Sequence, residues 1–280
     1  MTTFSRTDTS IVGRWWWTVD RWTLAAVVML MAFGTMLTLA SSPSIAISYN
    51  YDSLHFVKRH LVYLPLSATV IIIVSMMTPL QIRRLALFAF GLCVIGLAIT
   101  LVLGVEVKGS RRWLKFAGLS LQVSEFAKPT FAVVTAWLFA QRIRGTNFPG
   151  YTISSISFLI LIALVLRQPD FGQTAIISLV WMAQLFLTGL PIWIVTVLLI
   201  LAVAGLFIAY KTIPHVSDRI NNFLNPESAD RYQIEKSIDS FKNGGLFGQG
   251  PGEGVVKNHL PDAHSDFVFA VAGEELGLLL

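Results

Sequence analysis

Long apolar runs constrain this chain more than any other feature, because most of them approach the thickness of a bilayer. A membrane core needs about 20 apolar residues per helix, with a range of about 17–25. We therefore expect an all-α, polytopic transmembrane helix bundle of about eight spans. The apolar runs predict helices over Trp22–Ala40, Leu61–Met77, Leu85–Leu103, Phe126–Phe139, Ile153–Leu166, Phe171–Leu187, Ile192–Tyr210, and from near Phe267 onward.

Composition agrees with a membrane protein and excludes other classes. Hydrophobic residues make up 54% of the chain and charged residues 13%, whereas a soluble domain carries roughly a quarter charged residues. The basic residues are scattered and form no stripe with aromatic residues, which argues against nucleic-acid binding. The single cysteine, Cys93, lies inside an apolar run, so an internal disulfide and a cysteine-based metal cluster are excluded.

The first run predicts an uncleaved span rather than a signal peptide, because signal-peptide cores span only about 7–15 residues. Counting Lys and Arg in the short loops gives nearly equal numbers on the two sides. Arg6, Arg14 and Arg21 precede the first span and favour a cytoplasmic N-terminus. We expect a single integral membrane domain over residues 1–280, with a cytoplasmic tail at 1–21 and a large extracytoplasmic loop at 211–266. The last run reaches residue 280 without a polar flank, so we expect its helix to be cut there.

Three gaps between the apolar runs hold many ionisable side chains: Lys108–Lys128, Arg167–Asp170 and Lys211–Asp266. If the runs span a membrane in simple alternation, all three gaps open on the same side. Ionisable groups gathered at one face of an apolar protein suit the charged head group of a lipid. We therefore expect these stretches to converge into one pocket at the outer leaflet.

The first gap has two interpretations. Arg111, Arg112 and Lys115 lie among Trp113 and Phe116. They form either an amphipathic interfacial segment with snorkelling cations or a phosphate site, where arginine forks make bidentate contacts.

Two further pairs of charges are equally ambiguous. Glu125 and Lys128 are spaced i, i+3 on one helix face. Arg167 and Asp170 flank Pro169 in a very short gap. Exposed ion pairs contribute little, whereas ionisable residues at membrane depth are functional candidates.

The long gap predicts an amphipathic helix over Arg231–Lys242, with Tyr232, Ile234, Ile238 and Phe241 as candidate apolar contacts. The glycine-rich stretch that follows lacks the strand and helix that a Rossmann fingerprint requires, and it predicts a flexible loop near an active site.

Asp266 stands where this polar loop turns into the last apolar run. A partly desolvated carboxylate there can accept a proton from a sugar hydroxyl, and Asp is also a preferred helix N-cap. His264-Ser265-Asp266 holds the residue types of a hydrolase triad, but adjacent residues do not form that constellation. Glu274 and Glu275, further along the same run, are expected to face the bundle interior.

Several blocks, in order and spacing, resemble the SEDS family, and its division-type members most closely. They are Gly109-Ser110-Arg111-Arg112-Trp113-Leu114, Ser124-Glu125-Phe126-Ala127-Lys128, Gln168-Pro169-Asp170-Phe171-Gly172, Leu260-Pro261-Asp262-Ala263-His264-Ser265-Asp266-Phe267-Val268-Phe269-Ala270, and Gly273-Glu274-Glu275-Leu276-Gly277.

The resemblance implies about ten transmembrane helices and a glycosyltransferase that polymerises the peptidoglycan precursor lipid II outside the cytoplasmic membrane during cell division. It makes Asp266 the essential catalytic carboxylate. Ser265 and Asp262 depart mildly from the usual Thr and Glu. We assign substrate binding to Arg111, Arg112, Trp113, Glu125, Lys128, Asp170 and His264.

The expected partners are lipid II, a class B penicillin-binding protein with transpeptidase activity, and other membrane proteins of the divisome. A divalent cation, Mg²⁺ or Mn²⁺, is the one cofactor left open, and nucleic acid is not expected. Two other functions remain open: a flippase for the lipid-linked precursor and a non-catalytic divisome scaffold. The expected location is the bacterial cytoplasmic (inner) membrane.

Overall fold

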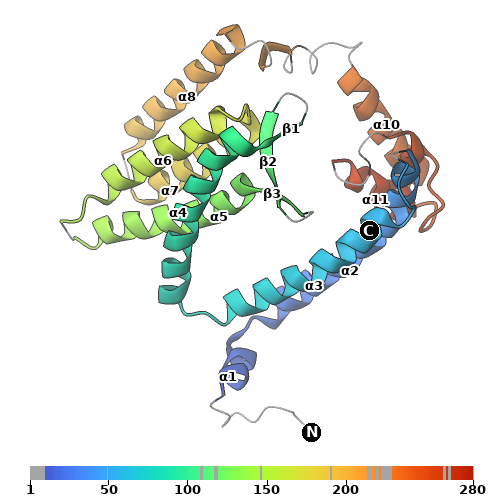
Figure 1. Ribbon diagram of the computed structural model, residues 1–280, viewed down its shortest axis with the longest axis horizontal. Helices are drawn as coiled ribbons and strands as arrows, with labels where there is room; N and C mark the ends of the chain where they lie inside the picture. Colours follow the sequence, from blue (N-terminus) through green and yellow to red (C-terminus); the bar gives the residue numbers. More distant parts are fainter. Residues whose placement is uncertain are drawn as a thin grey trace. The chain divides into compact units, whose positions relative to one another are not determined.

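The computed structural model describes residues 10–48, 50–107, 110–116, 119–145, 147–189, 191–212, 216–218, 221, 229–260, 263 and 266–279. The chain forms two compact units (Figure 1). The first comprises Met1–Met76 and Leu206–Leu280, and the second comprises Met77–Gly205.

The first unit is helical throughout its described elements. They are α1 (Ile11–Thr18), α2 (Arg21–Ser48), α3 (His55–Ser75), α10 (Ala229–Gly244), the 3-10 helix η1 (Val256–His259) and α11 (Val268–Leu276). A small apolar core joins α10, α11 and the segment around Leu260, with Phe241, Leu260, Ala270 and Val271 in contact.

The second unit packs four helices against a short sheet. Its elements are α4 (Pro79–Leu103), β1 (Val105–Val107), β2 (Ser110–Phe116), β3 (Leu119–Gln122), α5 (Val123–Ile143), α6 (Gly150–Leu166) and α7 (Phe171–Leu187). Helix α8 (Ile192–Thr212) begins in the second unit and ends in the first.

The apolar runs predict α2 to α8 correctly, and α7 has the expected bounds. Most of the other helices extend into flanking polar residues, as short cores require. Within the described residues, four helices are long and apolar enough to cross a membrane: Arg21–Pro43, His55–Ser75, Pro79–Leu103 and Ile192–Thr212. Helices α6 and α7 are apolar but shorter. The predicted loop helix is also confirmed, as α10.

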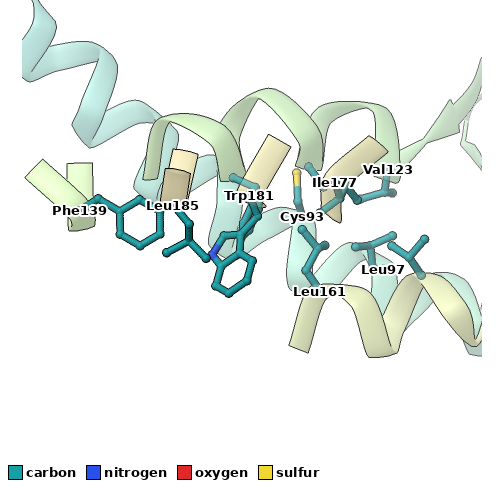
Figure 2. Packing of buried hydrophobic residues seen from close by; sticks show 11 residues of the cluster. Cys93, Leu97, Val123, Phe139, Leu161, Ile177, Trp181 and Leu185 are labelled. Carbon is teal, nitrogen blue, oxygen red and sulfur yellow. The ribbon is translucent and has the colours of Figure 1, made fainter. Parts of the chain in front are cut away.

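The core of the second unit lies where α4, α5, α6 and α7 meet (Figure 2). Phe158 and Trp181 stack with ring centroids 4.4 Å apart. Trp181 Nε1 donates to Ser154 Oγ at 2.8 Å, and Thr135 Oγ1 donates to Gln184 Oε1 at 2.6 Å. Such bonds between helices satisfy polar groups that a bilayer cannot hydrate.

Outside this core the helices expose large apolar side chains. Leu30, Phe88, Leu159 and Leu199 are between 56% and 71% exposed. Apolar surface on this scale is unfavourable in water and is favourable against lipid tails. The protein is therefore a multi-pass membrane protein.

The sheet between α4 and α5 was not expected from the sequence. Strands β1, β2 and β3 pair antiparallel in chain order, with Glu106 opposite Arg111 and Leu114 opposite Leu121. The interfacial segment predicted here is a β-meander because its side chains alternate with a period of two, which suits a strand. The helical fold class still holds for the molecule.

The last helix also differs from expectation. Helix α11 ends at Leu276, so the prediction of a helix continuing to residue 280 is wrong. Gly277 adopts a φ of 83°, and a Cβ on it would lie 2.4 Å from Gly248 N. The close packing of the glycine-rich loop against this position ends the helix.

Candidate active site

Strand β2 separates the two arginines that the sequence grouped together. Adjacent residues of a strand point to opposite faces of a sheet. Arg111 and Trp113 are exposed, while Arg112 and Leu114 are partly buried. Arg111 pairs instead with Glu106, its neighbour across the β1–β2 ladder, at 3.4 Å. Arg111 and Arg112 therefore do not form one phosphate fork.

Arg112 joins β2 to the start of α7. Its Nη1 lies 3.5 Å from Asp170 Oδ2, with the arginine side chain 28% and the aspartate 9% exposed. Its Nη2 donates to Pro169 O at 3.3 Å and to Ser110 Oγ at 3.0 Å. Its Nε is buried and has no hydrogen-bond partner among the described residues. The Nε–H of Arg112 thus remains available to donate to another acceptor.

Asp170 is the N-cap of α7, where its Oδ1 accepts from Gln173 N at 3.3 Å. Gln173 then reaches α5, since its Nε2 donates to Glu125 Oε1. Glu125 lies in the first turn of α5, where the helix dipole favours a negative charge, and its Oε2 is 2.7 Å from Lys128 Nζ. The predicted Glu125–Lys128 pair is confirmed.

These residues form one polar cluster of the second unit: Arg112, Asp170, Gln173, Glu125 and Lys128. Two cations face two carboxylates, so the cluster is formally neutral. Arg112 and Lys128 each already contact a carboxylate. To bind a pyrophosphate, each cation would have to contact the phosphate in addition to its carboxylate or in place of it. Arg167, by contrast, is exposed.

Sequence reasoning missed Gln173, although a signal for it was present. Asp170-Phe171-Gly172-Gln173 has the spacing of a capping box, in which an N-cap residue is followed three positions later by Glu or Gln. Here the glutamine side chain bonds to α5 rather than back to its own cap.

Asp266 belongs to the first unit, and its side chain is exposed. The predicted N-cap role is wrong, because the N-cap of α11 is Phe267, which makes no side-chain capping bond. His264 lies outside the described residues. Asp266 therefore remains accessible to a substrate. It lies in the loop, two residues before the first residue of α11.

Behind Asp266, α11 carries a buried carboxylate that organises the preceding loop. Glu274 is fully buried, as expected for an inward-facing residue. Its Oε1 accepts from the main-chain N–H groups of Val255 and Val256, each at 2.8 Å. Its Oε2 accepts from Lys257 N at 2.9 Å, and Asn243 Nδ2 donates to Oε1 at 2.8 Å. We call this arrangement the Glu274 cradle.

Beside the cradle, Lys257 Nζ pairs with Glu275 Oε1, and both side chains are almost completely buried. Lys257 Nζ also donates to Gly252 O at 3.2 Å. Breaking a buried pair by removing one partner leaves an uncompensated charge, so the pair resists separation. Lys257 was not singled out by the sequence, because its partner lies 18 positions away.

The glycine-rich loop is held to α11 through its backbone as well. Gln249 N and Gly250 N donate to the carbonyls of Glu274 and Glu275 at 2.9 and 3.0 Å. A Cβ at Gly248 would lie 2.2 Å from Glu275 O, so only glycine fits there. The loop predicted to be flexible is instead tied to the helix that follows Asp266.

A divalent cation finds no preformed site in the described part of the chain. No group of three or more His, Cys, Asp or Glu side chains there is placed to hold a metal ion. Glu125 and Asp170 are already engaged by cations, and Asp266 belongs to no such group of ligating side chains among the described residues. No chemical step is therefore assigned to a metal.

Comparisons with known proteins give a consistent picture. The family model FTSW_RODA_SPOVE, described as a cell cycle protein, matches residues 21–279. The chain is 42% identical over 278 residues to the "Probable peptidoglycan glycosyltransferase FtsW" of Caulobacter vibrioides, covering 99% of the chain and 71% of that protein. It is 35% identical over 273 residues to the protein of the same name from Coxiella burnetii, covering 94% and 73%.

Two solved structures share the fold. One is a chain from a study of the "structural coordination of polymerization and crosslinking by a peptidoglycan synthase complex", with a TM-score of 0.66, 23% identity, and coverage of 94% of this chain and 73% of that one. The other is the Thermus thermophilus rod shape determining protein RodA, with a TM-score of 0.52, 20% identity, and coverage of 94% and 96%. Both likenesses support the helical membrane fold.

Proposed function

We propose that this chain, which belongs to the FtsW/RodA/SpoVE family of cell cycle proteins, is a peptidoglycan glycosyltransferase that polymerises lipid II during cell division. The observation that carries the proposal is an exposed carboxylate, Asp266, just before a helix whose buried Glu274 and Glu275 fix the preceding loop. The 42% identity to a protein named for this activity supports it.

In the proposed reaction Asp266 is the general base. It accepts the proton from the 4-hydroxyl of the acceptor N-acetylglucosamine, and that oxygen attacks C1 of the donor N-acetylmuramic acid. The new C1–O bond forms as the bond to undecaprenyl pyrophosphate breaks on the opposite face, so the configuration at C1 inverts. The proton ends on Asp266, and the negative charge leaves on the pyrophosphate.

Cations in the second unit suit the charge of that leaving group. We propose that Arg112 and Lys128 bind the pyrophosphate. The unpartnered Nε of Arg112 donates a hydrogen bond to one of its oxygens. Arginine presents a planar fork that matches phosphate oxygens, and preorganised cations stabilise charge that develops in a transition state. Arg111 and Trp113, on the exposed face of β2, are proposed to contact the lipid or sugar portions of the substrate.

The protein is proposed to act in the bacterial cytoplasmic membrane with its N-terminus inside and Asp266 outside. We further propose that it assembles with a class B penicillin-binding protein and other divisome membrane proteins. The support is the structural likeness to a chain from a peptidoglycan synthase complex that couples polymerisation to crosslinking.

The test is glycan polymerisation from purified lipid II by the full-length protein with its transpeptidase partner. Asp266→Asn should lower the rate by about 10²–10⁴-fold, the contribution of a general base. Asp239→Asn, at a half-exposed position of α10 where the carboxylate pairs with Lys236 and Lys242, is the matched control and should polymerise normally. Near-normal polymerisation by Asp266→Asn would remove the proposed base, and flipping of lipid II in liposomes without polymer would favour transport.

A further inference from the structure

A second polar feature lies at the other end of the second unit from the polar cluster. The first turns of α4 and the last turns of α5 border an open pocket of about 310 Å³, lined in part by Arg83, Trp137 and Arg144. Glu125 and Arg144 are at opposite ends of α5, roughly 28 Å apart at about 1.5 Å per residue. This open pocket, the arginine pocket, is therefore separate from the candidate active site.

The arginine pocket contains two buried donors without acceptors. The Arg83 guanidinium lies 5.1 Å from the centroid of the Trp137 ring. Arg83 Nε and Trp137 Nε1 are both buried, and neither hydrogen bonds to any described residue. Buried polar groups in native proteins are nearly always satisfied, so two such donors on one pocket require an explanation. Both groups can only donate, so their complement is an acceptor.

The charge of this region points to an anionic acceptor. Arg84 and Arg142 stand beside the pocket residues Arg83 and Arg144, and the sequence has no Asp or Glu between Glu125 and Asp170. None of the four arginines forms an ion pair with a residue that the structure describes. An oxyanion would neutralise this excess and accept both orphan hydrogen bonds.

The remaining walls of the pocket are apolar. Leu80 and Val133 contribute to the lining, and Leu80 is 46% exposed. Ile143, next to Arg144, is 60% exposed. A soluble anion needs no apolar wall, whereas a phospholipid presents a phosphate and an acyl chain together. In the proposed orientation this end of the bundle faces the cytoplasmic leaflet.

We propose that the arginine pocket binds an anionic phospholipid of the cytoplasmic leaflet. The lipid phosphate accepts from Arg83 Nε and Trp137 Nε1, Arg144 adds a second positive charge, and an acyl chain lies along Leu80 and Val133. The pocket holds a lipid that is neither the substrate nor the product of the polymerase.

The experiment measures lipid binding to the purified full chain by native mass spectrometry, with phosphatidylglycerol and phosphatidylcholine as probes. Phosphatidylglycerol should bind preferentially. Arg83→Gln and Trp137→Phe should each weaken it by about tenfold, the usual effect of losing a hydrogen bond to a charged group. Arg83→Lys keeps the charge but lacks the Nε donor, so it should also weaken binding.

Arg84→Gln is the matched control, because it removes the same charge from the neighbouring residue, which does not line the pocket. It should leave binding within about twofold of the parent. Equal losses in Arg83→Gln and Arg84→Gln would reduce the effect to general electrostatics and overturn the proposal. Full competition by inorganic phosphate, or equal binding of phosphatidylcholine, would overturn the assignment to an anionic lipid. Circular dichroism of each variant establishes that it is folded.

Discussion

At the scale of single residues, the Arg112–Asp170 pair is the contact of the polar cluster whose loss should lower the stability of the protein most. Asp170→Asn retains an N-cap for α7, because Asn caps as well as Asp, but it leaves the partly buried Arg112 without its counter-charge. We expect a loss of about 1–3 kcal/mol in stability, the cost of leaving a buried polar group without its partner, together with lower polymerisation. Thermal unfolding of the detergent-solubilised protein measures the first effect. The exposed pair of Asp52 and Lys58 provides the control. Lys58 donates a hydrogen bond to Asp52 and so lowers the pKa of that carboxyl, but both side chains are more than half exposed. Asp52→Asn should therefore leave the unfolding midpoint unchanged. If both variants melt alike, the Arg112–Asp170 contact has no structural role.

At the scale of elements, the Glu274 cradle joins the glycine-rich loop to α11. Each carboxylate oxygen accepts from main-chain N–H groups, so Glu274→Gln must direct an NH₂ group at one of these donors. We expect a loss of about 2 kcal/mol and faster hydrogen exchange at the amides of Val255 and Lys257. Polymerisation should fall as well, because the same loop leads to Asp266. Glu253→Gln makes the same change at an exposed position of the same loop and should alter neither exchange nor activity. Slow exchange at Val255 in Glu274→Gln would show that the loop is held by its backbone contacts alone. The sequence could place Glu274 inside the protein, since it lies in an apolar run, but its partners depend on how a distant loop folds back.

At the scale of the whole molecule, the apolar runs were sufficient to predict α2 to α8, because lipid-facing helices need apolar residues on every side. The sheet before α5 was missed because its short strands have no such run, and Gln173 was missed because its bond crosses between helices. The orientation of the helices across the membrane was the least certain prediction, because the Lys and Arg counts of the loops on the two sides are nearly equal. It can be tested through the single native cysteine, because Cys93→Ala gives a background in which only an introduced cysteine reacts. In that background Lys115→Cys, exposed on β2, should react with a membrane-impermeant maleimide in intact spheroplasts. Arg144→Cys, exposed at the far end of α5, should react only after permeabilisation. The opposite pattern would place the polar cluster in the cytoplasm. With the polar cluster in the cytoplasm, glycan strands would have to be made before the precursor is exported. The proposed polymerisation at the outer face therefore requires the Lys115 end of this unit to lie outside.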